Sequence, residues 1–291
     1  MQDSVSVRTP AKINLTLDIL GKRYDGYHFV KTIMQTISVF DKIVIEKNQE
    51  NSIRIFCDTE GIPCDSKNLV YKAAIAFFEH IKIQPQGIDI HIDKSIPAMA
   101  GLAGGSSDAA GMIVALNEML NTNLSEDTLC EIAEKIGADV PFCIKGGTAV
   151  AEGVGDLITQ IPDIPECYIL VVKPDINIST PEAYAKFDML EFAKSSEFED
   201  MVASIATQNL EKMSSLLFNA LEYAADCEEI NEIKNQMLNS GAMGALMSGS
   251  GSAVYGIFDK KKQASKCAEI FEDKYSFIEI CTPHYGGVEI I

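Results

Sequence analysis

No stretch of this 291-residue sequence approaches the ~18 consecutive apolar residues that a membrane-spanning helix needs. The first residues, MQDSVSVRTPAKIN, also lack the basic and then apolar pattern of a secretory signal. Both absences argue against an integral membrane protein and against export. We therefore expect the chain to act in the cytoplasm.

The cysteines form no C-x-x-C pair, although the sequence contains eight of them. They are Cys57, Cys64, Cys130, Cys143, Cys167, Cys227, Cys267 and Cys281. Zinc sites usually need closely spaced ligands, so we expect no zinc and assign no metal ligand. Scattered cysteines in a chain without an export signal are typical of small buried side chains in a reducing compartment.

Positive charge is scarce in this chain. The 24 Lys and Arg residues are outnumbered by 42 Asp and Glu, which gives a formal net charge of −18. Such a chain repels long polyanions, so we expect neither nucleic acid nor an anionic membrane surface as a partner. A small anion can still bind where backbone N–H groups and a few lysines gather. The 47% hydrophobic content is that of a globular protein.

The order of the sequence patterns predicts two domains. Before residue 160, alternating or β-branched runs such as KINLTLDIL and KIVIEK predict strands, and helices are predicted over 68–83, 112–120 and 125–137. Beyond it, after the strand-like CYILVV, the predicted helices are 180–192, 199–209, 210–222, 228–240 and 260–275. We predict an N-terminal domain over 1–160 and an α+β C-terminal domain over 161–291.

A run of glycines and serines at the start of a predicted helix is the most unusual segment. Gly101, Gly104 and Gly105 precede Ser106 and Ser107. Glycines let a backbone approach an anion, and the N–H groups at a helix N-terminus bind phosphate. Such a cluster can also form only a turn. It is neither a P-loop nor a dinucleotide fingerprint, and protein-kinase signatures are absent.

Three further features are ambiguous when taken singly. Alternation places Lys12, Asn14 and Thr16 on one face of a strand, which could bind a ligand or form only the wet side of a sheet. Asp139 precedes a proline that we expect to begin a strand, so it could be a fixed functional group or an ordinary cap. The glycine-rich segment 247–252 is typical of a hairpin turn.

Taken together and in order, these segments resemble the GHMP kinases, which include galactose, homoserine, mevalonate and phosphomevalonate kinases. The matching segments are TPAKINLTLDILGKRYDGYH at 9–28, PAMAGLAGGSSDAA at 97–110, GADVPF at 137–142 and MSGSGSAVYGIF at 247–258. They span almost the whole chain. The D-G-Y-H loop is specific to the branch that acts on a cytidyl-diphosphate sugar alcohol. Alanine at 100 and 103 replaces the glycine of other members, and tyrosine at 184 replaces the phenylalanine of some.

The resemblance implies a two-domain α+β fold, with an N-terminal domain of the ribosomal S5 domain 2 type and a ferredoxin-like C-terminal domain. It implies ATP as co-substrate, Mg²⁺ bridging the phosphates, and phosphorylation of the 2-hydroxyl of the sugar alcohol. That reaction belongs to the non-mevalonate route to isoprenoid precursors. The partner is therefore a small molecule, and we expect a monomer or a homodimer.

The resemblance also assigns the site residues. Those that would wrap the ATP phosphates are Pro97, Ala98, Met99, Ala100, Gly101, Leu102, Ala103, Gly104, Gly105, Ser106 and Ser107. Those expected near the adenine are Lys94 and Asn68. Those expected to bind the acceptor are Asn14, Tyr27, His28, Thr180 and Tyr184. Lys12 and Asp139 would form the catalytic pair.

The chemistry of phosphoryl transfer suggests how these residues act. Asp139 would take the hydroxyl proton, and Lys12 would keep it ionised and favour the developing alkoxide. Whether Asp139 is a true base or an electrostatic partner stays open. Tyr27 and Tyr184 would stack on the cytosine, and His28 would read its edge through its ring or its backbone. The alternative is that Tyr27 and His28 are ordinary loop residues.

Three alternative functions remain open for this sequence. A homoserine or mevalonate kinase shares the glycine-rich loop but lacks D-G-Y-H. A non-catalytic binding protein on the same fold would have lost Lys12 or Asp139, and both are present. A purely structural protein leaves the phosphate loop unexplained. The residues therefore favour a kinase with a cytidyl acceptor.

Overall fold

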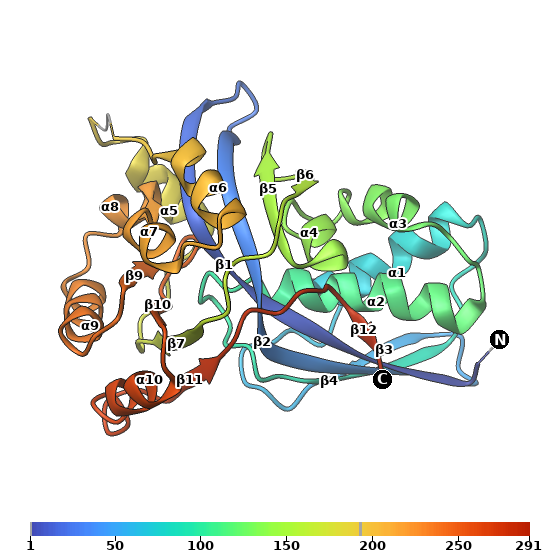
Figure 1. Cartoon of the computed structure of the whole chain (residues 1–291). Helices are drawn as coiled ribbons and strands as arrows, with labels where there is room; N and C mark the ends of the chain where they lie inside the picture. The colour runs from blue at the N-terminus through green and yellow to red at the C-terminus, as the bar shows by residue number, and fades with distance from the viewer. Residues whose placement is uncertain (1, 192–193) are drawn as a thin grey trace.

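The computed structural model describes residues 2–191 and 194–291, which form two adjoining α+β halves (Figure 1). The strands are β1 (Ser4–Lys22), β2 (His28–Lys47), β3 (Ile53–Phe56), β4 (Ile88–Asp93), β5 (Thr148–Glu152), β6 (Leu157–Gln160), β7 (Tyr168–Lys173), β8 (Phe218–Asn219), β9 (Gly244–Met247), β10 (Val254–Phe258), β11 (Phe277–Cys281) and β12 (Glu289–Ile290). The helices are α1 (Leu69–His80), α2 (Gly104–Leu120), α3 (Glu126–Ala133), α4 (Val140–Lys145), α5 (Thr180–Phe187), α6 (Phe198–Ala206), α7 (Leu210–Ser215), α8 (Ala220–Ala225), α9 (Glu228–Asn239) and α10 (Lys261–Ala268). None of these helices is long and apolar enough to cross a bilayer.

Two long strands, β1 and β2, organise the N-terminal half. They pair antiparallel from Ser4–Glu46 to Lys22–His28, within a sheet of order β12-β1-β2-β4-β3. The apolar and β-branched runs VSVRT and KINLTLDIL predict two strands where β1 is continuous, and FVKTIMQTISVF and KIVIEK predict two where β2 is continuous. That expectation was wrong, because a register shift between Pro10 and Ala11 bends β1 without ending it.

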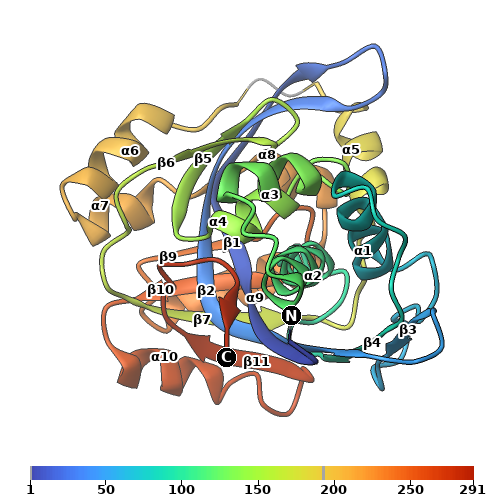
Figure 2. The same ribbon diagram turned by 90° about the vertical axis from the view of Figure 1, so that its right-hand side faces the viewer.

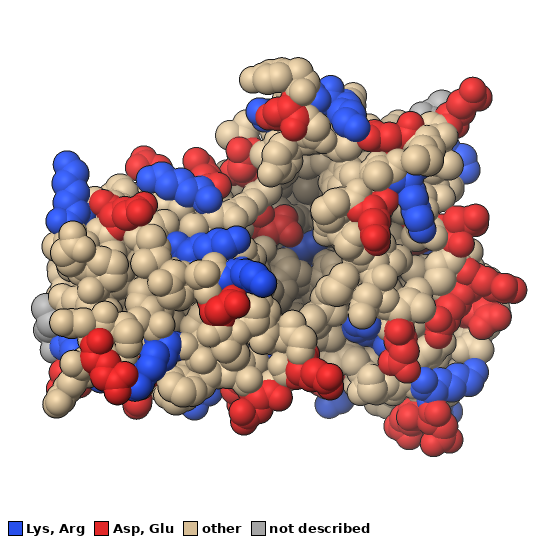
Figure 3. Space-filling model, turned by 180° about the vertical axis from the view of Figure 1, so that it is seen from behind, with Lys and Arg blue, Asp and Glu red and all other residues tan. Residues whose placement is uncertain are grey.

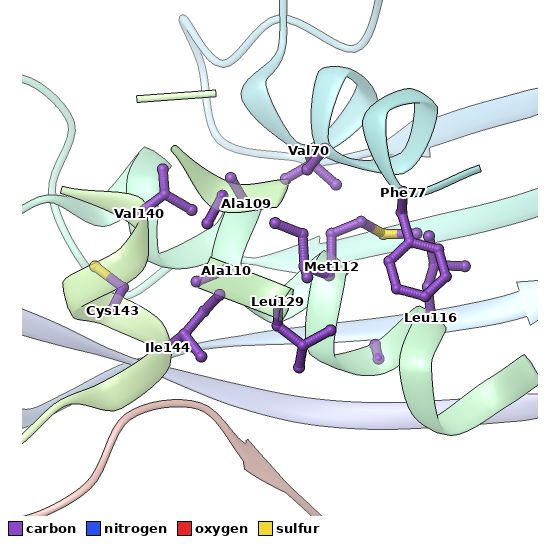
Figure 4. Close-up of a cluster of buried hydrophobic side chains, with 14 of the residues drawn as sticks. Val70, Phe77, Ala109, Ala110, Met112, Leu116, Leu129, Val140, Cys143 and Ile144 are labelled. Atoms are coloured by element: carbon purple, nitrogen blue, oxygen red, sulfur yellow. The ribbon is translucent and has the colours of Figure 1, made fainter. Parts of the chain in front are cut away.

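Helices α1–α4 cover one face of this sheet, and their apolar side chains form its core (Figure 4). Val70 and Phe77 of α1 pack against Met112 and Leu116 of α2 there. Helix α2 lies very close to β1, since a β-carbon at Gly111 would stand only 2.4 Å from Thr9 Cγ2. This close packing holds α2 against β1, and the phosphate loop leads into the N-terminus of this helix.

The C-terminal half contains a second, antiparallel sheet of order β11-β7-β10-β9. Along the chain these strands and their helices follow the order β-α-β-β-α-β, which is the ferredoxin-like arrangement. The two-domain α+β fold predicted from the resemblance is confirmed. The division at residue 160 remains a prediction.

Several contacts join the two halves. Strand β8 pairs parallel with β1, and β12 returns from the C-terminal half to pair with β1, so both termini lie on the same side of the molecule (Figures 1 and 2). The fully buried Tyr255 of β10 donates its hydroxyl to the Asn14 carbonyl of β1 at 2.8 Å. The strand that carries Asn14 is thus held from both halves.

Several predicted elements differ from the observed ones. Helix α2 begins at Gly104 instead of residue 112, and the helix expected over 210–222 is divided into α7, β8 and α8. The helix expected over 180–192 ends at Phe187, and its last residue, like residue 1 of the predicted N-terminal domain, lies outside the described residues.

Candidate active site

A cavity of about 1010 Å³ lies between the two halves and brings together nearly all the predicted site residues. Its walls come from β1, the β1–β2 turn, the loop before α2, the start of α4, helix α5 and the loop 249–251. Figure 3 shows a hollow with charged side chains inside it on the face seen from behind.

The loop before α2 presents an uncapped helix N-terminus to this cavity. Helix α2 begins at Gly104, and no side chain caps it and no acidic residue occupies its first turn. Met99, Gly101 and Ala103 have positive φ values of 52°, 73° and 58°. That conformation costs an alanine about 1–2 kcal/mol, so packing must hold the loop in place. Free N–H groups at the end of a 17-residue helix suit a phosphate.

The second glycine-rich segment supplies that packing. The Ser248 hydroxyl donates to the Gly101 carbonyl at 3.0 Å, and the Ala253 N–H donates to the Ala100 carbonyl at 3.1 Å. A β-carbon at Gly101 would stand 2.0 Å from the Ser248 carbonyl oxygen. Residues 249–251 also line the cavity. The segment interpreted as a plain hairpin turn therefore braces the phosphate loop.

Lys12 connects this loop to the polar stripe of β1. Its buried ammonium donates to Asn14 Oδ1 at 2.7 Å and to the Gly101 carbonyl at 2.9 Å. Asn14 Nδ2 in turn donates to Thr32 Oγ1 at 2.8 Å. The stripe is therefore a buried hydrogen-bonded network, and not the wet side of a sheet.

Asp139 lies at the N-cap position of α4 but makes no capping hydrogen bond. Its Oδ2 is 3.9 Å from Lys12 Nζ, and 38% of its side chain is exposed. Burial, and then the charge of Asp139, raise the pKa of the Tyr184 hydroxyl, and both side chains line the cavity. The strand expected after Asp139 was wrong, because Pro141 lies in the first turn of a helix, where a missing N–H costs nothing.

Lys94 lines the cavity, but its ammonium is already paired. It forms buried ion pairs with Asp41 and with Asp108, the latter at 2.7 Å. Burial alone would lower the pKa of Lys94, and the two aspartates together raise it instead. Asp41 Oδ1 also accepts the N–H groups of Ser95 and Ile96 at 2.6 and 2.8 Å. Lys94 thus ties both ends of the phosphate loop to β2, and its contact with adenine stays a prediction.

Asn68, like Lys94, forms hydrogen bonds within the protein. Its Oδ1 caps α1 by accepting the Val70 N–H at 2.9 Å, and its Nδ2 donates to the Pro63 carbonyl at 2.7 Å. This cap defines the first turn of α1. It lines the cavity beside Lys94, so its proximity to a bound base stays a prediction.

The acceptor end combines the β1–β2 turn with α5. The His28 ring stacks on Tyr184 with centroids 4.7 Å apart, and its Nε2 is 2.7 Å from Asp188 Oδ1. Tyr27 lines the cavity with 64% of its surface exposed. The Thr180 hydroxyl is 2.9 Å from that of Ser250. The structure therefore places His28, and not Tyr27, against one face of Tyr184.

Ser107 departs from its predicted location. The other phosphate-loop residues from Pro97 to Ser106 line the cavity, whereas Ser107 is fully buried and donates its hydroxyl to the Pro10 carbonyl at 2.7 Å. It therefore anchors α2 to β1.

Sequence reasoning missed several residues of the site. Asp188 was detectable, because it lies four residues after Tyr184 and forms the C-cap of α5, on the same face as that tyrosine. Thr32, Asp41 and Asp108 gave no local signal, since their hydrogen-bond partners lie at least 14 positions away in the sequence.

The comparisons with known proteins agree with this geometry. The model of the GHMP kinases N terminal domain matches residues 68–147, and that of the GHMP kinases C terminal domain matches residues 199–276. The chain therefore belongs to the GHMP kinase family, and the predicted resemblance is confirmed.

Particular relatives narrow the family further. A protein of Caldicellulosiruptor bescii named 4-diphosphocytidyl-2-C-methyl-D-erythritol kinase is 44% identical over 91% of this chain and 93% of its own length. A crystal structure of 4-(cytidine 5'-diphospho)-2C-methyl-D-erythritol kinase has a TM-score of 0.80 at 31% identity, over 97% of this chain and 99% of that one. A homoserine kinase from Cytophaga hutchinsonii also reaches 0.80, over 100% of this chain and 98% of its own, but at 18% identity it shares only the fold.

Proposed function

We propose that this protein transfers the γ-phosphoryl group of ATP to the 2-hydroxyl of 4-diphosphocytidyl-2-C-methyl-D-erythritol. It is a small-molecule kinase of the non-mevalonate route to isoprenoid precursors. One observation carries the proposal. A single cavity joins an uncapped helix N-terminus, the Lys12–Asp139 pair and an aromatic end built on Tyr184.

Different groups of the site have different roles in phosphoryl transfer. The N–H groups at the start of α2 hold the phosphates, and the acceptor hydroxyl attacks the γ-phosphorus in line with the bond to ADP. That bond breaks as the new P–O bond forms, and the hydroxyl proton passes to Asp139. Lys12 lies beside both Asp139 and the phosphate loop, so its charge stabilises the negative charge that develops between them.

Mg²⁺ fits this site as an ion that arrives with ATP. Among the described residues, no group of three or more His, Cys, Asp or Glu side chains could form a metal cage. Magnesium needs only one or two protein oxygens besides phosphate oxygens and water. Ser106 lines the cavity in the first turn of α2 and would supply one such oxygen. When bound, the ion neutralises phosphate charge.

The main rival is another acceptor on the same fold. The homoserine kinase matches this fold as closely as the cytidyl enzyme does, so the fold does not choose between them. The 44% identity to a cytidyl kinase and the aromatic end of the cavity favour the cytidyl acceptor.

The test is ADP release in the presence of Mg²⁺ and a panel of acceptors. We expect turnover with 4-diphosphocytidyl-2-C-methyl-D-erythritol, and turnover lower by orders of magnitude with homoserine, mevalonate and unmodified methylerythritol. Phosphorus NMR of the product should place the new phosphate on the 2-hydroxyl. Preferred turnover of homoserine or mevalonate would assign another branch of the family. In this proposal the protein acts in the cytoplasm, as a monomer or a homodimer. Sedimentation of the purified enzyme measures which of these two oligomeric states it adopts.

A further inference from the structure

Asp188 holds the His28 ring from the opposite side of the cavity. His28 is the first residue of β2, and Asp188 follows the last turn of α5. One carboxylate oxygen lies 2.7 Å from His28 Nε2, and the other accepts from Lys22 Nζ at 2.6 Å. The imidazole is buried and stacks on Tyr184, so its orientation is fixed from several sides.

This contact determines which ring nitrogen carries a proton. The hydrogen bonds from Lys22 and then from His28 lower the pKa of Asp188, so the carboxylate is ionised and can only accept. Nε2 must therefore donate, and in the neutral ring Nδ1 is left as an acceptor. Among the described residues, Nδ1 has no hydrogen-bond partner, and 6% of the His28 side chain is exposed. His28 lines the cavity, so this acceptor is available to a ligand there.

A cytosine and a uracil differ at the atom that such an acceptor can read. Cytosine carries an amino donor at position 4, whereas uracil has a carbonyl oxygen there, as thymine does. An acceptor at Nδ1 pairs with the cytosine amine and leaves the uracil carbonyl facing another lone pair. An unpaired buried acceptor is costly, so this one atom can discriminate between the bases.

We propose that Asp188 is a positioning residue for base specificity: by holding Nε2–H of His28, it keeps Nδ1 as the acceptor that selects a cytidyl over a uridyl substrate. This inference rests on the proposed cytidyl kinase function. Stability does not explain the Lys22–Asp188 ion pair, because an ion pair that is partly exposed to solvent contributes little to it.

Asp188→Asn is the sharpest test, because Lys22 dictates how the new amide must turn. The Lys22 ammonium cannot accept a hydrogen bond, so the amide oxygen faces Lys22 and the amide NH₂ faces His28. Nε2 then becomes the acceptor, and the proton moves to Nδ1. The ring now offers a donor to the base, which suits uracil.

The experiment compares kcat/KM for the cytidyl acceptor and its uridyl analogue, with ATP saturating. We expect the wild type to prefer the cytidyl acceptor by roughly 5- to 150-fold, and Asp188→Asn to lose that preference through its KM values. The double variant Lys22→Met/Asp188→Asn frees the amide to turn its oxygen to Nε2, so it should regain part of the preference. Nitrogen-15 NMR of the His28 ring should show Nε2–H in the wild type and Nδ1–H in Asp188→Asn.

The possible results distinguish a failure of this inference from a failure of the proposed function. A folded Asp188→Asn enzyme with wild-type base preference would overturn the inference, and so would an equal loss for both acceptors. A wild type that favours the uridyl acceptor would also overturn it. A wild type that phosphorylates neither acceptor would instead refute the proposed function, which is a distinguishable result.

Discussion

The Lys12 ammonium lies 3.9 Å from the Asp139 carboxylate, although the two residues belong to β1 and to the start of α4. Lys12 is buried and donates to the Gly101 carbonyl of the phosphate loop, whereas Asp139 is partly open to the cavity. One cation thus touches the phosphate loop and the proposed proton acceptor. Substitution of Lys12 should therefore change ATP affinity as well as turnover, whereas substitution of Asp139 should change mainly the turnover.

Lys12→Met should reduce both turnover and ATP affinity. The methionine keeps the apolar stem but removes the donor to Gly101 and Asn14 and the charge beside Asp139. We expect kcat to fall by roughly 10²- to 10³-fold, as for loss of a transition-state donor, and KM for ATP to rise. Steady-state kinetics at varied ATP measures both. An unchanged KM for ATP would show that Lys12 does not shape the phosphate loop.

Gly105→Ala and Gly101→Ala form a matched pair. A β-carbon at Gly105 meets only Leu69 Cδ1 at 3.7 Å, so that variant should fold while its methyl group obstructs the phosphates. A β-carbon at Gly101 would collide with the Ser248 carbonyl, at a φ of 73°, so that variant should lose thermal stability. Calorimetric titration should show weaker ATP binding and intact cytidyl-ligand binding for Gly105→Ala. Equal losses for both ligands would indicate misfolding instead.

Asp108→Asn should remove a pH dependence of stability. Burial raises the pKa of the Asp108 carboxyl to about 7, against an ordinary value of 3.8, despite the charge of Lys94. The native state therefore keeps this proton to a higher pH than the unfolded chain does. The stabilising contribution is complete below about pH 4 and is lost as the pH rises to about 7. Urea unfolding between pH 5 and 8 should show a smaller decline in the variant, and identical slopes would contradict the assignment.

Tyr27→Ala and Tyr184→Ala should weaken binding of the cytidyl substrate selectively. Loss of a base-stacking ring costs about 1–3 kcal/mol. Tyr27 is 64% exposed, so its removal should leave stability unchanged, whereas Tyr184→Ala also removes the support of His28. Tyr184→Phe keeps the ring and is the control. If both alanine variants retain the wild-type KM for the cytidyl substrate, the stacking assignment is wrong.

Local patterns in the sequence marked the segments to which the resemblance assigned the site residues. Each of these patterns is visible in residues that are adjacent in the sequence. They are the glycines before α2, the alternation of Lys12 and Asn14, and the D-G-Y-H loop. Each of these segments lies on the cavity wall. The α+β class also followed from local patterns, because apolar periodicity reports which face of a strand or helix is buried.

Contacts between residues that are far apart in the sequence could not be predicted in the same way. The second glycine-rich segment looked like a hairpin turn, since nothing near it in sequence reveals that Ser248 packs on Gly101. The resemblance placed Lys94 near the adenine, and nothing near Lys94 in the sequence reveals that its ammonium pairs with the buried carboxylates of Asp41 in β2 and Asp108 in α2. The strand expected after Asp139 failed because a proline is as suitable for a first helical turn as for a strand edge.

Asp139→Asn tests the central claim most directly. The substitution keeps the size of the side chain and removes its charge and its ability to take a proton, and no capping bond of α4 is lost. The measurement is single-turnover phosphoryl transfer to 4-diphosphocytidyl-2-C-methyl-D-erythritol, with both ligands shown to bind. We predict a rate lower by roughly 10²- to 10⁴-fold with little change in either affinity. A folded variant that transfers the phosphoryl group at the wild-type rate would contradict this account.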